Sequence, residues 1–167
     1  MLPGIVVKPL KRFADERGFF TEIFRSDWKE LLNEDSVQQA NFSITYPGMI
    51  RAWHRHERGQ VDYFLVMRGR IKICAYDESS KELNELISTE ENLQLLRIPG
   101  FYWHGFKVLG NNSAYLLYFV NRLYNSNEPD ELRISWNDSI IVPKKINGRD
   151  DDPRCNKPWD WFYPPFR

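Results

Sequence analysis

Residues 61–76 read VDYFLVMRGRIKICAY, and this stretch predicts a β-hairpin. Two runs rich in apolar residues flank the pair Arg68-Gly69, which is expected to form the turn. In the second arm Ile71, Ile73 and Ala75 alternate with Arg70, Lys72 and Cys74, which is the period of a strand with one buried face. The hairpin therefore indicates a β-rich fold, with Cys74 as a small buried hydrophobe.

Further short elements are expected on both sides of the hairpin. The expected strands are Gly4–Leu10, Phe19–Phe24, Gln38–Thr45, Leu93–Ile98 and a central, wholly apolar Ala114–Val120. Ser26–Leu32 reads as a short helix with Ser26 as its N-cap, and the charged stretch Asp77–Glu91 as a turn and a surface ribbon. Many short strands without βαβ alternation predict a mainly β fold, an antiparallel double-stranded barrel or jelly roll with one or two short helices.

Composition limits what the chain can be. Its 167 residues fit one domain spanning 1–167, and 42% hydrophobic residues fit a globular protein. Lys+Arg 23 equals Asp+Glu 23, so nothing indicates nucleic acid or a membrane as partner. Two cysteines and no secretory signal predict a cytoplasmic setting. Apolar Ile5–Val7 and the aromatic tail 155–167 predict packing on the barrel or on a partner subunit, as in a homodimer.

The chain has three histidines, His54, His56 and His104. A single histidine is more often structural than functional. All three, however, lie at ends of expected strands beside turn residues, which favours a shared site. An imidazole with a pKa near 6.5 is suited to proton transfer at neutral pH.

Six segments occur in the order seen in dTDP-4-dehydrorhamnose 3,5-epimerases, a family of the cupin superfamily, and the chain resembles that family. The segments are Asp15–Glu22, Gln39–Ser43, Gly48–His54, Pro99–Phe106, Tyr118 and Trp136–Asp138. The resemblance implies an epimerase or isomerase that acts without a cofactor on a dTDP-linked 4-keto-6-deoxyhexose, in deoxysugar or polysaccharide biosynthesis. It also implies a homodimer whose subunits exchange an N-terminal strand.

The resemblance implies roles for single residues. His54 matches the base that removes a proton beside the ketone, and Tyr118 matches the acid on the opposite face, with Tyr124 in reserve on the same strand face. The remaining matches bind substrate: Arg17 and Arg51 on the diphosphate, Glu22, Gln39 and Asn41 on base and sugar, Phe19 or Phe20 stacked on thymine, and His104 on the sugar. Read individually, an arginine can equally be a surface charge, and Tyr118 or a phenylalanine a core residue.

Three departures from the family pattern stand out. Asp62 replaces a lysine that stabilises the enolate oxygen, a task for which a carboxylate is unsuited; Lys72, Lys107 and Arg51 are the replacement candidates. His56 replaces a glutamine. The carboxylate that orients the basic histidine has no clear match, and Asp150–Asp152 are either that group or a solvated loop.

The first two departures agree with another hypothesis, a metal-dependent cupin enzyme. Its ligands would be His54, His56, Asp62 and His104, a donor set suited to iron, manganese, nickel or zinc. A third hypothesis is a non-catalytic nucleotide-sugar binder that lost its chemistry together with the lysine.

Overall fold

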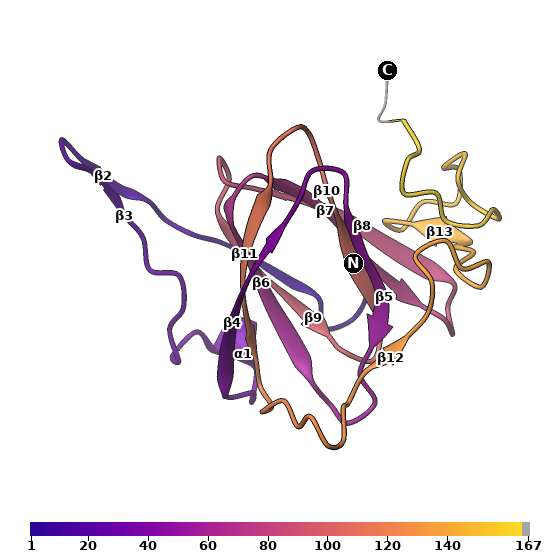
Figure 1. Cartoon of the computed structure of the whole chain (residues 1–167), viewed down its shortest axis with the longest axis horizontal. Helices are drawn as coiled ribbons and strands as arrows, with labels where there is room; N and C mark the ends of the chain where they lie inside the picture. The colour runs from indigo at the N-terminus through magenta and orange to yellow at the C-terminus, as the bar shows by residue number, and fades with distance from the viewer. Residues whose placement is uncertain (165–167) are drawn as a thin grey trace.

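The computed structural model describes residues 1–164. Two antiparallel sheets face each other, and a small two-stranded arm projects from one side of the molecule (Figure 1). The strands are β1 (Val6–Pro9), β2 (Phe13–Asp15), β3 (Gly18–Phe20), β4 (Gln39–Thr45), β5 (Ile50–Arg55), β6 (Val61–Arg68), β7 (Arg70–Asp77), β8 (Glu82–Thr89), β9 (Gln94–Pro99), β10 (Trp103–Val108), β11 (Ala114–Val120), β12 (Leu132–Arg133) and β13 (Lys145–Ile146). Among the described residues, the one α-helix is α1 (Lys29–Leu32).

The strand order is that of a double-stranded jelly roll. One sheet runs β1-β9-β6-β11-β4 and the other β12-β5-β10-β7-β8-β13. All neighbours are antiparallel except β13, which pairs with β8 in parallel. The predicted fold class is confirmed, and β11 lies inside its sheet as expected.

The core between the sheets is built from the inward faces of the strands. Phe64, Leu96 and Leu116 of the five-stranded sheet join one buried cluster with Ile73 and Phe106 of the six-stranded sheet. Side chains alternate between the two faces of a strand, so the other residues of these strands point outward. This core fills one part of the barrel, and the candidate site occupies another.

The second arm of the hairpin is not half-buried as predicted, because its outer face is covered as well. Cys74 and Tyr76 belong to a cluster that includes Trp159 and Trp161 of the C-terminal segment, residues 147–164. Lys72, on the same outer face, is itself buried. Of the aromatic tail, residues up to 164 are described, and Phe166 lies outside them.

Three local predictions were wrong. The helix begins after Trp28 and not after Ser26, since the Asp27 carboxylate pairs with Arg25 and the chain is still turning there. The strand predicted at Phe19–Phe24 ends at Phe20, because Ile23 and Phe24 pack on the outer face of the five-stranded sheet.

The third error concerns the charged stretch Asp77–Glu91, most of which forms β8. The expected turn is present, because Asp77 accepts hydrogen bonds from the hydroxyls of Ser79 and Ser80. The segment after it pairs along its full length with β7, and Leu83 is completely buried.

Candidate active site

A cavity of about 980 Å³ opens between the two sheets. Strands β4, β6 and β11 supply one wall and β5 the other, while the segment after β11 forms the rim. Its lining includes most of the predicted site residues, namely Gln39, Asn41, Arg51, His54, His56, Asp62, Tyr118 and Tyr124. The cavity is large enough for a small-molecule ligand of the size of a nucleotide sugar.

His54 enters the cavity from β5, next to the edge strand β12. Its backbone is paired with His104 of β10 on one side and with Arg133 of β12 on the other. Burial, followed by the charge of the adjacent His104, holds the pKa of His54 well below its usual value. The ring is therefore neutral at physiological pH, the form in which an imidazole accepts a proton.

Tyr118 enters the same cavity from the opposite sheet. It lies on β11 between Asn41 of β4 and Phe64 of β6, and its ring packs edge-on against Phe64 at a centroid distance of 5.9 Å. Burial, together with the negative charge of Asp62, raises the pKa of the Tyr118 hydroxyl. The hydroxyl therefore keeps its proton at neutral pH and can act as a donor.

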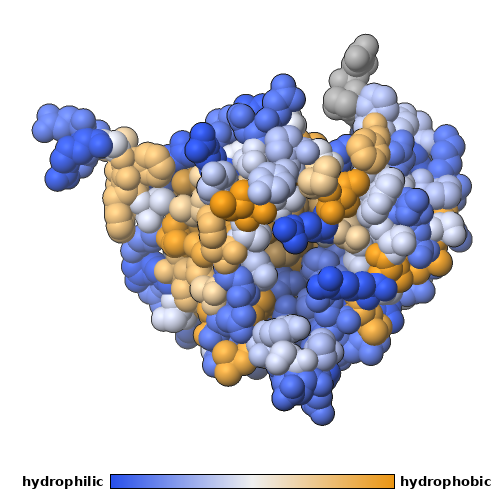
Figure 2. Space-filling view, in the orientation of Figure 1, coloured by the Kyte–Doolittle hydropathy of each residue, from blue (hydrophilic) through white to orange (hydrophobic). Residues whose placement is uncertain are grey.

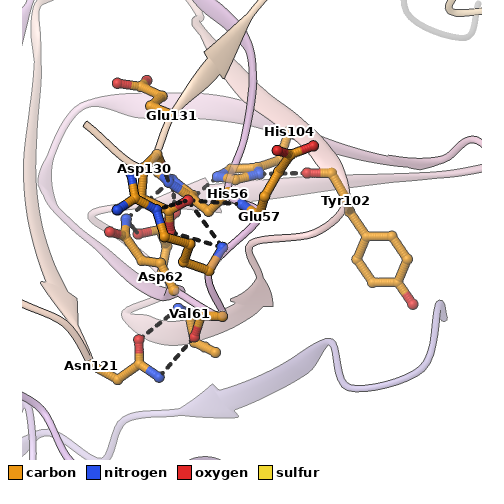
Figure 3. Close-up of polar contacts among 12 residues, drawn as sticks. His56, Glu57, Val61, Asp62, Tyr102, His104, Asn121, Asp130 and Glu131 are labelled. Atoms are coloured by element: carbon orange, nitrogen blue, oxygen red, sulfur yellow. Dashed lines mark hydrogen bonds and ion pairs between the residues drawn. The ribbon is translucent and has the colours of Figure 1, made fainter. Parts of the chain in front are cut away.

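A buried cluster of His56, Asp62 and His104 lies beside His54. The His104 Nε2 is 2.8 Å from Asp62 Oδ2, and the His56 Nε2 is 3.5 Å from the same oxygen. The ring centroids of His54 and His104 are 4.2 Å apart. Figure 3 shows His56, Asp62 and His104 pointing toward one another. The exposed fractions of His56, Asp62 and His104 are 6%, 2% and 0%.

The charges in this cluster are strongly coupled. Burial alone would raise the pKa of Asp62, but the hydrogen bonds and charges of His104 and His56 lower it far below its usual value. Burial opposes charge on His56 as well, yet the Asp62 carboxylate outweighs this effect and raises the His56 pKa. Asp62 is therefore a buried anion that needs a positive partner.

Two further polar groups are arranged on the walls. Gln39 and Asn41 project from the same face of β4, and the Gln39 amide donates to Asn41 Oδ1 at 2.7 Å. Arg51 is anchored by its Nε, which donates to the Thr45 hydroxyl at 2.9 Å. The rest of its guanidinium remains available for a ligand.

Comparison with known proteins gives one consistent result. Residues 1–153 match the family model described as dTDP-4-dehydrorhamnose 3,5-epimerase. The chain belongs to this family.

Individual relatives agree with the family model. The chain is 42% identical over 137 residues to the probable low-salt glycan biosynthesis epimerase Agl13 of Haloferax volcanii, which covers 79% of the chain and 86% of the relative. It is 40% identical to the spore coat polysaccharide biosynthesis protein SpsL of Bacillus subtilis, and this match covers 84% of the chain and 94% of the relative. Among solved structures, the RmlC epimerase from Legionella pneumophila in complex with dTDP-4-keto-L-rhamnose superimposes with a TM-score of 0.74. The two sequences are 26% identical, and the match covers 89% of this chain and 86% of that structure's chain. The prediction of an epimerase of nucleotide-linked 4-keto sugars is thereby confirmed.

Not every predicted site residue of this epimerase lies at the cavity. Arg17, Phe20 and Glu22 are on or next to the β2–β3 arm and do not line it. The Arg17 side chain is 85% exposed and pairs with Asp15, while Glu22 pairs with Arg25. Within one chain the arm points away from the body (Figure 1), so these residues cannot act in this chain's own cavity as placed.

Two other site residues occupy unexpected positions. His104 is fully buried and does not line the cavity, whereas the resemblance implies that it contacts the sugar. Tyr124 is not on the strand face of Tyr118, because β11 ends at Val120 and Tyr124 belongs to the rim. Its backbone N–H donates to Gln39 Oε1 at 2.9 Å.

Most of the residues considered as replacements for the family lysine, or as the carboxylate that orients the basic histidine, do not lie at the cavity. Lys72 and Lys107 lie on the outer face of the six-stranded sheet, where they contact Glu85 and the Trp161 carbonyl. Arg51 is the one of the three that lines the cavity. The run Asp150–Asp152 is remote, since Asp151 and Asp152 pair with arginines of the same segment, and the buried carboxylate next to the histidines is Asp62.

The rim contributes residues that the sequence pattern did not single out. Arg58, Arg122 and Arg133 line the cavity opening, where Arg58 pairs with Glu128 and Asp130 and Arg133 pairs with Glu131. Asp130 accepts from the backbone N–H groups of Glu57 and Arg58, which ties the rim to the end of β5. Only the tertiary fold brings 121–134 against β5, so no local sequence signal could have identified these residues.

Proposed function

We propose that this enzyme epimerises a dTDP-linked 4-keto-6-deoxyhexose, with His54 as the base and Tyr118 as the acid. The observation that carries the proposal is their placement on opposite walls of one cavity, His54 on β5 and Tyr118 on β11. Inversion at a carbon beside a ketone requires that a proton leaves one face of the ring and another arrives at the opposite face. A sugar ring held between the sheets presents its two faces to these two groups.

Arginine side chains at the cavity support binding of the diphosphate. Arg51 is held on one wall by Thr45, and the rim arginines Arg58, Arg122 and Arg133 surround the opening. Guanidinium groups donate paired hydrogen bonds to phosphate oxygens. The polar pair Gln39 and Asn41 offers amide donors and acceptors to the base or sugar.

We further propose a cytoplasmic homodimer in which the β2–β3 arm of one subunit completes the cavity of the other. The arm carries exposed Phe13, Phe19 and Phe20, which a monomer leaves in water. Figure 2 shows a hydrophilic arm tip followed by hydrophobic side chains toward the body. Exchange would bring Arg17, Phe20 and Glu22 to the substrate. Light scattering should give twice the chain mass of 20.0 kDa, and a value equal to one chain would refute the dimer.

Both cysteines, Cys74 and Cys155, are free and buried, which suits a reducing compartment. No helix among residues 1–164 is long and apolar enough to cross a membrane.

Incubation with dTDP-4-keto-6-deoxyglucose in deuterated water tests the reaction. We expect deuterium at carbon 3, carbon 5 or both, detected by NMR and mass spectrometry. Folded protein that binds dTDP and incorporates no deuterium would instead indicate a non-catalytic binder.

The roles of the two residues can be separated with a Tyr118→Phe variant. Because His54 alone removes the proton, Tyr118→Phe should still exchange deuterium but should lose most inversion, about 10²-fold or more. Tyr115→Phe is the matched control, since Tyr115 lies on the same strand and packs against Phe42 on the other face. Equal loss of exchange and inversion in Tyr118→Phe would contradict the assigned role.

A further inference from the structure

We propose that His56, Asp62 and His104 bind a divalent transition-metal ion, with His54 left free beside it as the base. The proposal rests on the proposed function only for the role of His54. It narrows the set of four residues that the sequence suggested as ligands to three, and the orientation of each ring carries the argument.

The Nδ1 atoms of His104 and His56 already have hydrogen-bonding partners. His104 Nδ1 lies 2.8 Å from the Tyr102 carbonyl oxygen, and His56 Nδ1 contacts the Asp130 carbonyl oxygen (Figure 3). A carbonyl only accepts, so both Nδ1 atoms must carry the proton and donate. In neutral rings both Nε2 atoms then carry lone pairs directed inward. Backbone acceptors of this kind orient metal-binding histidines in general.

These lone pairs meet a carboxylate. Oδ2 of Asp62 is 2.8 Å from His104 Nε2 and 3.5 Å from His56 Nε2. Oxygen and nitrogen acceptors at such distances repel each other unless a positive charge lies between them. A proton on His104 Nε2 would relieve one contact, whereas a metal ion would satisfy the carboxylate and both imidazoles together.

Gln60 contacts both Asp62 and His56. Its amide nitrogen is 2.9 Å from Asp62 Oδ1 and 3.1 Å from His56 Nε2, so one N–H group can point at each atom. In the neutral form of His56, Nε2 carries the lone pair that accepts the second of these bonds. The same lone pair is what a metal ion would take, with the ion replacing the amide at this nitrogen.

His54 differs from the other two histidines. Within the described chain, neither of its ring nitrogens has a hydrogen-bonding partner, so nothing fixes one nitrogen toward the cluster. The ring lines the cavity and stands edge-on to His104. It lies close enough to be a fourth ligand, since the ligand atoms of all four residues are within 4.8 Å of one another. The missing orienting contact nevertheless favours a free His54.

The donor set defines the class of ion. Two imidazole nitrogens and one carboxylate oxygen suit zinc, iron(II) or manganese(II), with a coordination position left open. His56 and Asp62 line the cavity, so that open position faces the substrate space. When bound, such an ion supplies positive charge near the place where the proposed reaction develops negative charge on oxygen.

Metal content decides the proposal directly. The full chain, produced without an affinity tag, is treated with a chelator and titrated with Zn²⁺ by calorimetry, followed by elemental analysis after gel filtration. We expect one zinc ion per chain and a higher unfolding temperature with zinc than without it. A folded protein that retains no Zn²⁺, Fe²⁺ or Mn²⁺ would overturn the site and leave a proton between His104 and Asp62.

Variants test the ligand assignment. Asp62→Asn and His56→Gln should both lose stoichiometric zinc, with circular dichroism confirming that each is folded; two variants are used in case one fails to fold. Asp150→Asn, an exposed carboxylate in a remote loop, is the matched control and should keep the metal. Zinc retention by both ligand variants would overturn the proposal.

His54→Gln separates this site from the proposed function. It should keep one zinc ion and lose deuterium exchange, whereas loss of zinc would show that His54 is a ligand and overturn its assignment as the free base. Zinc bound by wild-type protein that exchanges no deuterium would support the metal site and refute the reaction. Full exchange by chelator-treated protein that rebinds no metal would support the reaction and refute the metal site.

Discussion

Gly105 shows how much the site depends on a residue without a side chain. It lies between His104 and Phe106, where the pairing of β10 with β5 shifts in register. A Cβ atom built at Gly105 would come within 2.3 Å of the Ala52 Cβ and 2.6 Å of the Arg51 carbonyl oxygen. Both atoms belong to β5, the strand that carries His54, so any side chain at position 105 displaces the base.

A Gly105→Ala variant should therefore lose about 1–3 kcal/mol of unfolding free energy through overpacking, together with most of its deuterium exchange. Chemical denaturation and the exchange assay measure the two effects. Gly110→Ala is the control, because no atom lies within 4 Å of a Cβ built at this position. Only its positive φ is unfavourable for alanine, so this variant should lose about 1–2 kcal/mol of unfolding free energy. Its deuterium exchange should be unchanged. Unaltered exchange in Gly105→Ala would show that β5 tolerates the displacement.

Sequence reasoning identified the gathering of His54, His56 and His104, because all three follow or precede turn signals at strand ends. The metal hypothesis also placed Asp62 with these histidines, although Asp62 and His104 are separated by 42 positions and meet only across the barrel. In the epimerase hypothesis, by contrast, Asp62 was only a group that opposes the reaction, whereas burial between two imidazoles makes this carboxylate the centre of the cluster.

Among the elements, the C-terminal segment covers the outer face of the sheet that carries the base. Trp161 is buried against Trp53, the neighbour of His54, with ring centroids 4.9 Å apart. The indole N–H groups of Trp53 and Trp161 both donate to the Trp136 carbonyl at 3.1 Å. The outer face of the six-stranded sheet is therefore sealed by residues far along the chain.

Trp161→Ala should lower the unfolding free energy by about 3–5 kcal/mol, as expected for a large aromatic residue removed from a core. Thermal and urea denaturation check this value. Phe162→Ala removes an exposed ring of the same segment and should cost about 1 kcal/mol or less. Similar losses in both variants would mean that the segment contributes little through Trp161.

The same segment should make stability dependent on pH. Arg154 holds Asp152 through hydrogen bonds of 2.8 and 2.9 Å and lowers its pKa, so this contribution is present above the unfolded value near 3.8. It is lost as the pH falls through the folded pKa. Arg154→Met should therefore be less stable than wild type by about 1–3 kcal/mol at pH 7, with the difference shrinking below pH 4. A difference independent of pH would attribute the loss to packing alone.

The error over β8 has a physical cause. β8 carries Glu82, Asn84, Glu85 and Ser88, which read as surface, yet Asn84 and Ser88 are buried on the inner face of the sheet, opposite Ala75 and Ile71 of β7. The hairpin of β6 and β7 was predictable because its apolar alternation is local. The covering of β7 was not, because residues some eighty positions later provide it.

At the scale of the whole molecule, the β2–β3 arm separates predicted site residues from the cavity. Arg17 is exposed on the arm, whereas Arg51 is on the cavity wall. If the arm reaches a second subunit, each cavity is built from two chains, as a closed twofold dimer allows.

Subunit mixing tests this arrangement. Arg17→Ala and His54→Gln proteins, each nearly inactive, are unfolded together and refolded. An exchanged arm gives each mixed dimer one intact cavity, so activity should recover to roughly one quarter of wild type. Arms acting on their own chain would give no recovery, because every cavity would then carry one defect.

The cover formed by Trp159 and Trp161 also sets an order on synthesis. These tryptophans are synthesised after every strand of the sheet that they cover, so the apolar outer face of that sheet has no cover until they are made. A chaperone that shields apolar surfaces would find its target there, on the back of the strand that bears the base, until the last tryptophans arrive and displace it.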